Sequence, residues 1–167
     1  MFSVGELIIY SRQGICCIDD ICKKTYDGVT KVYYVLHPIE NCKLTISIPV
    51  DNYKVTMLDI IDKNEAKQII ESFRFQGVSW IEICSQRNSI YLEVLKKGNR
   101  KEISKMVNTL MRKKYRADIN GKKLYKQDHE LLDFAQNILF KELAISLDTT
   151  FEAIYEKITN IIVESEK

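Results

Sequence analysis

Positive charge is the strongest chemical signal in this sequence, and it is concentrated in one segment. Residues 86–126 contain thirteen Lys and Arg and only three acids, although the whole 167-residue chain has a formal net charge of +2. The flanking residues 1–62 and 127–167 are both acidic. The single tryptophan, Trp80, lies just before the basic segment. Clustered cations beside a large aromatic side chain are typical of a surface that binds nucleic acid.

Both parts of this signal also have a purely structural interpretation. Lysine and arginine opposite an apolar stripe commonly form an ordinary solvated helix face. Burial statistics favour a core or interdomain position for a lone tryptophan. In the functional interpretation, Trp80 is exposed and wedges against unstacking bases in a minor groove. The surplus of positive charge favours phosphate contacts, because three acids cannot neutralise thirteen bases locally.

Residues that commonly carry catalysis are few and poorly spaced. The sequence has two histidines, His37 and His129, and it lacks a nucleophile elbow, a P-loop, a dinucleotide-binding motif and a zinc-protease motif. Asp19 and Asp20 are adjacent, and neighbours on a strand point to opposite faces, so they make a poor acid–base pair. We therefore expect no enzymatic activity and no cofactor.

Cysteine usage predicts reduced thiols rather than disulfides or a metal site. The number of cysteines is odd and no two form a C-x-x-C pair: Cys16, Cys17, Cys22, Cys42 and Cys84. Such residues pack as small hydrophobes in a cytosolic protein. Cys22, His37 and Cys42 could be imagined as metal ligands, but they lack the paired spacing of structural zinc sites. With no secretory signal and no apolar run of about 20 residues, we expect a cytoplasmic protein without membrane contact.

Residues 1–61 are predicted to form a small β module. Apolar runs near residues 7–10 and 15–22 are followed by an Asp27-Gly28 hairpin signal and a further strand candidate at residues 31–36. Alternating apolar residues at 44–48 and a short run at 55–58 supply two further strands. Five short strands without helical periodicity indicate a Tudor- or SH3-like barrel.

Residues 62–167 are predicted to form an all-α bundle of about five helices, so the fold class is α+β in two modules. Asp62 with Glu65 has the form of a capping box for the first helix, which Gly77 should break. Gly98 should end the second helix, and Asn99 should cap the third. Basic residues fall off the apolar stripe of that third helix: Arg100, Lys101, Lys105, Arg112 and Lys113.

The last two helices are less sharply delimited by the sequence. The fourth is predicted over residues 122–147, after a turn at 118–121. Thr149 with Glu152 is a second possible capping box, which would start the fifth helix. Residues 164–167 are expected to fray.

Taken together, the order of these motifs resembles the CarD family of bacterial transcription regulators. The opening M-F-S-V-G-E-L-I-I-Y-S-R-Q-G-I-C-C-I, with Y-Y-V-L and L-T-I-S-I-P further on, is similar to the start of that family. It is also similar to the RNA-polymerase-interacting domain of the transcription-repair coupling factor. The later pattern of Trp80, Arg87, L-K-K-G-N and a basic helix fits as well, so the resemblance covers nearly the whole chain.

This resemblance implies a specific function. Family members dock a Tudor-like domain on the β subunit of RNA polymerase, partly by strand addition, which relies on main-chain hydrogen bonds. Their helical domain contacts promoter DNA, largely without sequence specificity, at the upstream edge of the melted region. A tryptophan wedged in the minor groove then stabilises the open complex.

Carried over by position, the resemblance assigns residues to both contacts. The implied DNA-binding residues are Trp80, Arg87, Lys96, Lys97, Arg100, Lys101, Lys105, Arg112 and Lys113. The implied polymerase-binding residues are Lys24, Lys43, Thr45, Ser47 and Pro49.

Two features depart from the family pattern. Ser47 replaces a polymerase-facing arginine, and the segment from Trp80 to Gly98 is about one helical turn longer than in other members. Two alternatives also stay open at this point. One is a protein–protein adaptor without DNA contact, and the other is an RNA-binding module.

Overall fold

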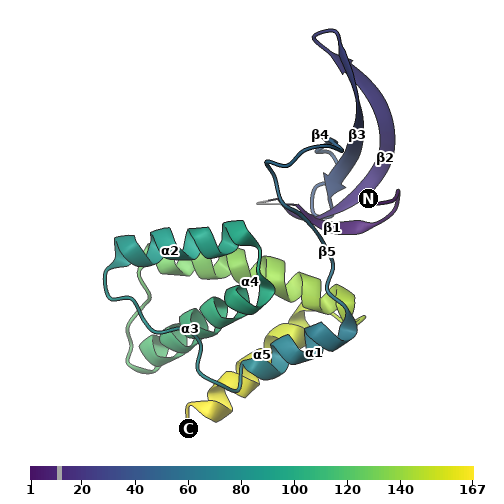
Figure 1. Ribbon diagram of the computed structural model, residues 1–167. Coiled ribbons are helices and arrows are strands. Elements are labelled where there is room, and N and C mark those ends of the chain that lie inside the picture. The colour runs from purple at the N-terminus through teal and green to yellow at the C-terminus, as the bar shows by residue number, and fades with distance from the viewer. Residues whose placement is uncertain (11–12) are drawn as a thin grey trace. The chain divides into compact units, whose positions relative to one another are not determined.

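The computed structural model describes residues 1–10 and 13–167, which divide into two compact units. We call Met1–Ile60 the sheet unit and Ile61–Lys167 the helical unit. The described residues form five strands followed by five helices (Figure 1), which confirms the predicted α+β fold with a Tudor-like first part. No helix among the described residues is long and apolar enough to cross a membrane.

The sheet unit is one antiparallel sheet with the strand order β4-β3-β2-β1-β5. Its strands are β1 (Leu7–Tyr10), β2 (Gly14–Tyr26), β3 (Val29–Pro38), β4 (Ile46–Pro49) and β5 (Met57–Asp59). The long, curved β2–β3 hairpin dominates it (Figure 1). The predicted turn at Asp27-Gly28 closes this hairpin. Both residues have positive φ, 49° and 78°, as a type I′ turn requires.

One face of the sheet carries a small apolar core. Ile8, Cys16, Ile18 and Leu36 are completely buried, and Ile48 is nearly so. Burial, reinforced by the neighbouring Cys17, raises the pKa of the Cys16 thiol to about 11. Cys16 therefore packs as an uncharged apolar side chain, as the sequence predicted.

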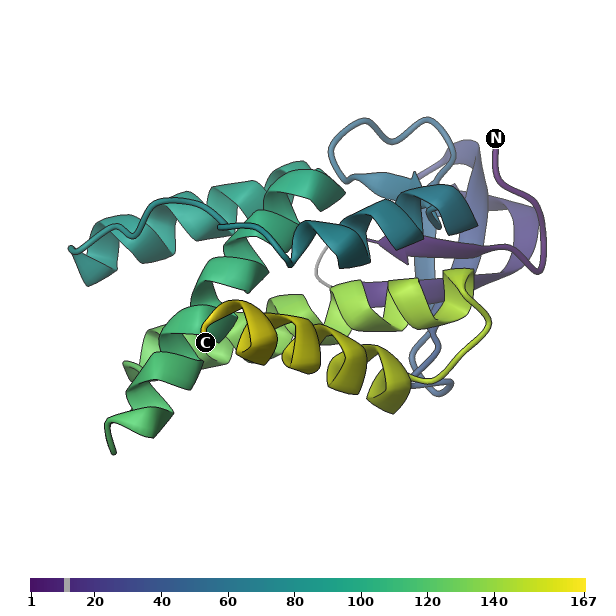
Figure 2. The ribbon, with the colours of Figure 1, turned by 90° about the horizontal axis from the view of Figure 1, so that it is seen from below.

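The helical unit is built around α3, which contacts each of the other four helices. The helices are α1 (Lys63–Ser72), α2 (Cys84–Lys97), α3 (Arg100–Ile119), α4 (Lys126–Ser146) and α5 (Phe151–Ser165). Figure 2 shows α4 and α5 side by side, and α4 also packs on α3. The basic segment of the sequence thus includes the central helix of its unit.

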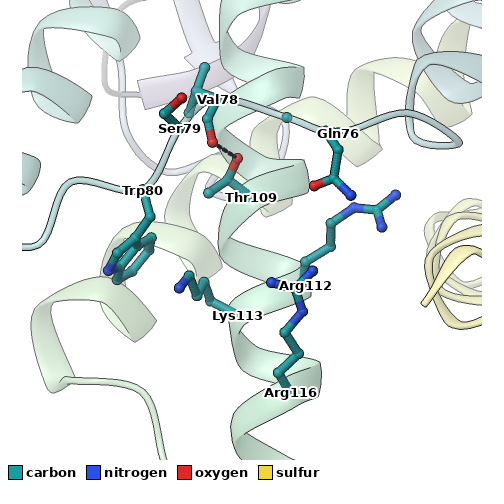
Figure 3. A pocket seen from close by; sticks show the side chains of 9 residues that line it. Gln76, Val78, Ser79, Trp80, Thr109, Arg112, Lys113 and Arg116 are labelled. Carbon is teal, nitrogen blue, oxygen red and sulfur yellow. Dashed lines mark hydrogen bonds between the residues drawn. The ribbon is translucent and has the colours of Figure 1, made fainter. Parts of the chain in front are cut away.

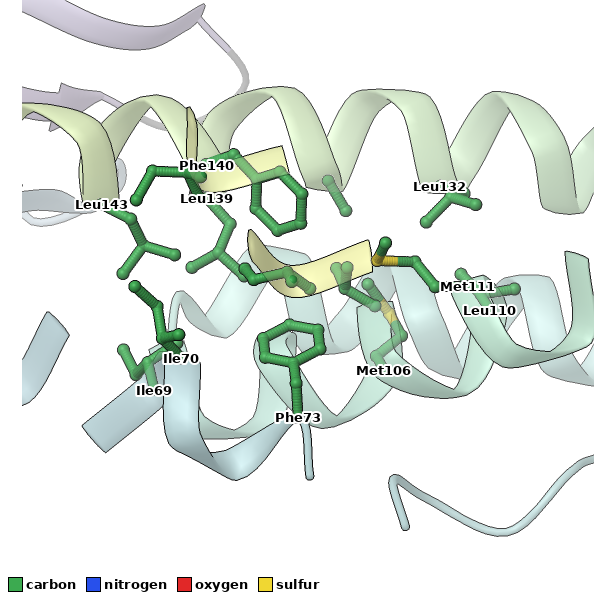
Figure 4. Packing of buried hydrophobic residues seen from close by; sticks show 14 of the residues in the cluster. Ile69, Ile70, Phe73, Met106, Leu110, Met111, Leu132, Leu139, Phe140 and Leu143 are labelled. Carbon is green, nitrogen blue, oxygen red and sulfur yellow. The ribbon is translucent and has the colours of Figure 1, made fainter. Parts of the chain in front are cut away.

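Large apolar side chains from several helices meet in one core. Phe73, Met106, Leu110, Phe140 and Leu143 are each at most 1% exposed (Figure 4). The rings of Phe73 and Phe140 meet edge to face, with their centroids 6.3 Å apart. This core fixes the inner side of α3 and so determines which of its residues reach the surface.

Most of the predicted helix ends are confirmed. Asp62 accepts a hydrogen bond from the N–H of Glu65, and Asn99 accepts one from the N–H of Glu102. Gly98 ends α2 in the left-handed conformation (φ 71°). The cap of α5 was predicted one residue too early. Thr150, and not Thr149, accepts the capping hydrogen bond.

Two other boundaries differ from the prediction. α3 continues to Ile119, so the predicted turn begins within it, and α4 starts only at Lys126. Gly121, with φ 64°, lets the chain reverse, and the N–H of Lys122 then donates to the carbonyl of Ala117. The predicted fraying after residue 164 is also wrong, because Glu166 is held by two arginines.

Candidate nucleic-acid interface

Residues 73–83 join α1 to α2 and carry Trp80; we call this segment the tryptophan loop. The side chains of α3 hold its backbone in place. Asn108 Nδ2 donates to the carbonyl of Phe75 (2.8 Å), and Thr109 Oγ1 donates to that of Val78 (2.9 Å). Both donors are buried, so the loop depends on them to satisfy its own carbonyl groups.

Gly77 lets the loop lie directly on α3. A Cβ atom at this position would lie 2.3 Å from Thr109 Oγ1 and 2.4 Å from the carbonyl oxygen of Lys105. Only a residue without a side chain fits such a close approach. From the sequence, this glycine was expected to break the preceding helix, but α1 already ends at Ser72, and the role of Gly77 is in packing.

Arg112 was predicted to contact DNA, but the structure buries it. Its side chain is 3% exposed and is fully engaged inside the protein. It donates to Asn108 Oδ1 (2.7 Å), to the carbonyls of Phe73 (2.8 Å) and Phe75 (3.2 Å), and to Glu166 (2.7 Å). Arg112 therefore positions the start of the tryptophan loop.

Arg87 holds the other end of the same loop and is likewise not a surface cation. It is completely buried and forms a two-point ion pair with Asp128, with Nε donating to Oδ1 at 2.8 Å. Its remaining nitrogen donates to the carbonyls of Ile81 and Glu82. The hydrogen bonds to Asp128 raise the pKa of Arg87, so the guanidinium stays charged in the interior. Direct phosphate contact, as predicted for Arg87, is excluded in this arrangement.

Trp80 is half-buried, between the two states that the sequence left open. The Arg87 guanidinium lies 4.0 Å from the centroid of the indole ring, and Lys113 Nζ lies 4.6 Å from it. Cations at these distances over an indole face are attracted by its quadrupole. The indole also packs against the helical core. The ring is thus held in a fixed orientation while part of it stays accessible.

A surface hollow opens beside the indole (Figure 3). It is lined by the tryptophan loop and by one side of α3: Gln76, Gly77, Val78, Ser79, Trp80, Thr109, Arg112, Lys113 and Arg116. Figure 3 shows Lys113 pointing toward the indole, with Arg112 and Arg116 also reaching out from α3. Arg116 was not among the predicted site residues. Its spacing, four positions after Arg112 in the same basic run, was the available signal.

Exposed lysines continue this positive surface along α3. Lys101, Lys105 and Lys113 recur with Thr109 at intervals of four residues, so they share one side of the helix. Lys101 and Lys105 are exposed, as are Lys96 and Lys97 in the last turn of α2. We call Lys101, Lys105 and Lys113 the lysine row. Lys101 and Lys105 are exposed enough for phosphate contacts, whereas Lys113 is half-buried, with its Nζ at the Trp80 indole.

Arg100, also predicted to bind DNA, pairs with an internal carboxylate. Its Nη2 donates to Glu142 Oε1 at 2.9 Å, and the Arg100 side chain is only 15% exposed. Glu142 also accepts a hydrogen bond from the N–H of Ile61 (3.1 Å). Burial raises the pKa of Glu142, and the bonds from Arg100 oppose that shift. Arg100 therefore ties α3 to α4 within the helical unit.

The predicted polymerase-binding residues lie in the sheet unit around its edge strand β4. Lys43 and Thr45 are exposed just before β4, and Pro49 ends it. Lys24 Nζ on β2 donates to Ser47 Oγ on β4 at 2.8 Å. Lys24 and Ser47 are thus neighbours in space across the sheet.

The remaining polar clusters do not suggest a metal centre. In residues 1–10 and 13–167, no three His, Cys, Asp or Glu side chains converge as metal ligands would. His37, considered as a ligand beside Cys22 and Cys42, instead contacts the Asp19 carboxylate at 2.8 Å.

Two family models together match residues 2–159 of the chain. The CarD-like/TRCF RID domain matches residues 2–61, and the CarD C-terminal domain matches residues 61–159. The chain is also similar to a protein of Bacillus subtilis (strain 168) named as a putative transcription factor, YdeB. The two are 25% identical over 146 residues, which cover 87% of this chain and 92% of the relative.

Proposed function

Because the chain belongs to the CarD family and is therefore an RNA-polymerase-interacting transcription regulator, we propose a two-point contact with the transcribing complex. The sheet unit docks on the β subunit of RNA polymerase. The helical unit contacts promoter DNA at the upstream edge of the melted region and stabilises the open complex. Neither contact involves catalysis by this protein.

The indole of Trp80 is the observation that carries the DNA half of this proposal. A half-exposed ring that contacts two cations and lies beside a hollow combines an apolar wedge with phosphate-binding charge. Apolar wedges hold a bent or opened duplex in the minor groove. Lysine contacts to phosphates position a protein without reading sequence. Lys96, Lys97, Lys101, Lys105 and Lys113 are the side chains that we assign to phosphate.

The edge of the sheet supports the polymerase half. β4 pairs with β3 on one side and has no second strand partner within the described part of the sheet. An edge strand offers main-chain donors and acceptors to a partner strand. Lys24, Lys43, Thr45, Ser47 and Pro49 surround this edge. Because Lys24 donates to Ser47, its amino group places a positive charge beside the strand where the resemblance implies an arginine at position 47.

Replacing Trp80 tests the DNA contact. Trp80→Ala should shorten the lifetime of a promoter open complex at least about fivefold, because aromatic stacking on a base contributes roughly 1–3 kcal/mol. The measurement is the decay of heparin-resistant complexes formed by polymerase with and without the protein. Polymerase binding, measured in the same samples by co-elution, should be unchanged.

Tyr125→Ala is the matched control, because Tyr125 is an exposed aromatic residue of the helical unit outside the hollow. It should leave the lifetime unaltered. An unchanged lifetime for Trp80→Ala, with normal polymerase binding, would instead favour an adaptor without DNA contact. Thermal unfolding of each variant separates lost contact from lost folding.

A further inference from the structure

Glu166 pairs with two arginines that line the hollow beside Trp80. Both of its carboxylate oxygens are bonded: Oε1 accepts from Arg112 Nη1 (2.7 Å) and Arg116 Nη2 (2.8 Å), and Oε2 accepts from Arg116 Nε (2.6 Å). Arginine recognises carboxylate and phosphate with the same two-point geometry. Arg112 and Arg116 both line the hollow next to Trp80.

The two arginines depend on Glu166 to different extents. Arg112 is buried and keeps Asn108 and two loop carbonyls as partners without it. Arg116 has 48% of its side chain exposed, and Glu166 is its only ion-pair partner among the described residues. Arg116 can therefore exchange Glu166 for a solvent-borne anion while the tryptophan loop stays in place.

The backbone of Glu166 lies just past the last residue of α5, where its N–H donates to the carbonyl of Ile162. It lies outside residues 61–159, the part that matches the CarD C-terminal domain. Its arginine partners, Arg116 first, lower the pKa of Glu166, so the carboxylate is charged at neutral pH. One negative charge therefore lies within the positive surface that we assign to DNA.

We infer that Arg116, supported by Arg112, forms a binding site for a DNA backbone phosphate, and that Glu166 occupies and blocks this site in the free protein. The inference rests on the proposed DNA contact and adds to it an internal competitor. While Glu166 is paired with Arg116, the carboxylate keeps this guanidinium from the DNA backbone, so the phosphate contact forms only when the charge of Glu166 is removed. Glu166 thereby lowers the affinity of the free protein for DNA.

Removing the charge of Glu166 tests the inference. Glu166→Gln in the full chain should tighten binding to a short labelled DNA duplex roughly three- to tenfold at low salt, because Arg116 gains a charge-assisted bond to phosphate. The slope of log K against log salt should steepen by about 0.9, which corresponds to one added phosphate contact. Fluorescence anisotropy over a salt series measures both quantities.

Two further variants make the result specific. Glu164→Gln removes the same charge from an exposed residue nearby and should leave both quantities nearly unchanged. Arg116→Ala alone should have little effect on DNA affinity, since Arg116 is already occupied. In the double variant with Glu166→Gln, Arg116→Ala should abolish both the tighter DNA binding and the steeper salt dependence.

The outcomes distinguish this inference from the proposed function. If the wild-type protein binds DNA with a salt-dependent affinity but Glu166→Gln binds equally or more weakly, Glu166 only braces Arg112 and the inference is overturned. It is also overturned if the gain in affinity survives Arg116→Ala. If neither protein binds DNA, and Trp80→Ala leaves the open complex unchanged, the proposed DNA contact itself fails.

Discussion

At the scale of single residues, the largely buried arginines and the lysines of the basic segment have separate tasks. Arg87, Arg100 and Arg112 each pair with an internal carboxylate, on Asp128, Glu142 and Glu166 respectively. The lysines assigned to DNA are half-exposed or exposed. A guanidinium is planar, weakly hydrated and forked, which suits buried ion pairs, while a compact ammonium is strongly hydrated.

The pair formed by Arg87 and Asp128 gives the sharpest test of this division. Arg87→Met should lower the free energy of unfolding by about 3–5 kcal/mol, because it leaves the Asp128 carboxylate buried without a partner. Urea unfolding followed by circular dichroism measures the loss. Arg87→Met with Asp128→Leu should recover most of the stability, since an apolar pair of similar volume needs no charge compensation. A loss below about 1 kcal/mol for the single variant would contradict the buried pairing.

The sequence could reveal the basic segment but not this division of tasks. Helical spacing correctly put Lys101 and Lys105 on the outside of α3. It also put Arg112 there, because the acceptors that draw Arg112 inward are backbone carbonyls of the tryptophan loop. Glu166, its other partner, is 54 positions away. Local patterns carry no information on contacts of such long range.

At the scale of elements, the tryptophan loop is a rigid segment without secondary structure. Its carbonyl groups accept hydrogen bonds from side chains of α2 and α3 instead of from the backbone N–H groups of a helix or strand. Cap signals predicted where the neighbouring helices begin and end. They could not predict the path between the helices, which buried polar side chains of other elements determine.

Gly77 is the position where this packing can be disturbed most directly. Gly77→Ala should destabilise the helical unit by about 1–3 kcal/mol, because the added methyl collides with α3 and pushes the loop away. The indole should then lose its contacts with Arg87 and Lys113, which a shift in tryptophan fluorescence reports. Ser79→Ala, at an exposed position of the same loop, should change stability by less than about 0.5 kcal/mol. Equal fluorescence in the glycine variant and the wild type would refute the tight packing.

At the scale of the whole molecule, each of the two units has its own core and one of the two proposed contacts, with polymerase or with DNA. Each contact can be weak, because docking on polymerase raises the effective concentration of the helical unit at the promoter. We predicted modules of residues 1–61 and 62–167. The compact units meet between Ile60 and Ile61, and Ile61 packs with the helical core. We predict from these separate cores that the helical unit folds on its own.

Cutting the chain at this point tests that prediction. A fragment of residues 61–167 should unfold cooperatively as a helical protein and keep salt-dependent DNA binding, but it should not co-elute with polymerase. A fragment starting at Lys63 is the matched control. It lacks the Asp62 cap and the hydrogen bond from Ile61 to Glu142, so it should be less stable by about 1–2 kcal/mol. A disordered 61–167 fragment would mean that the helical unit needs the sheet unit to fold.

The way in which the tryptophan loop is held has a consequence for how this surface can evolve. Four side chains donate hydrogen bonds to backbone carbonyl oxygens of the loop, and every amino acid has such an oxygen. Except at Gly77, substitutions in residues 76–79 can therefore change the side chains that face the DNA without changing the path of the backbone. Among relatives, the amino-acid sequence of the loop should therefore vary more than that of the α2 and α3 residues that bind its backbone.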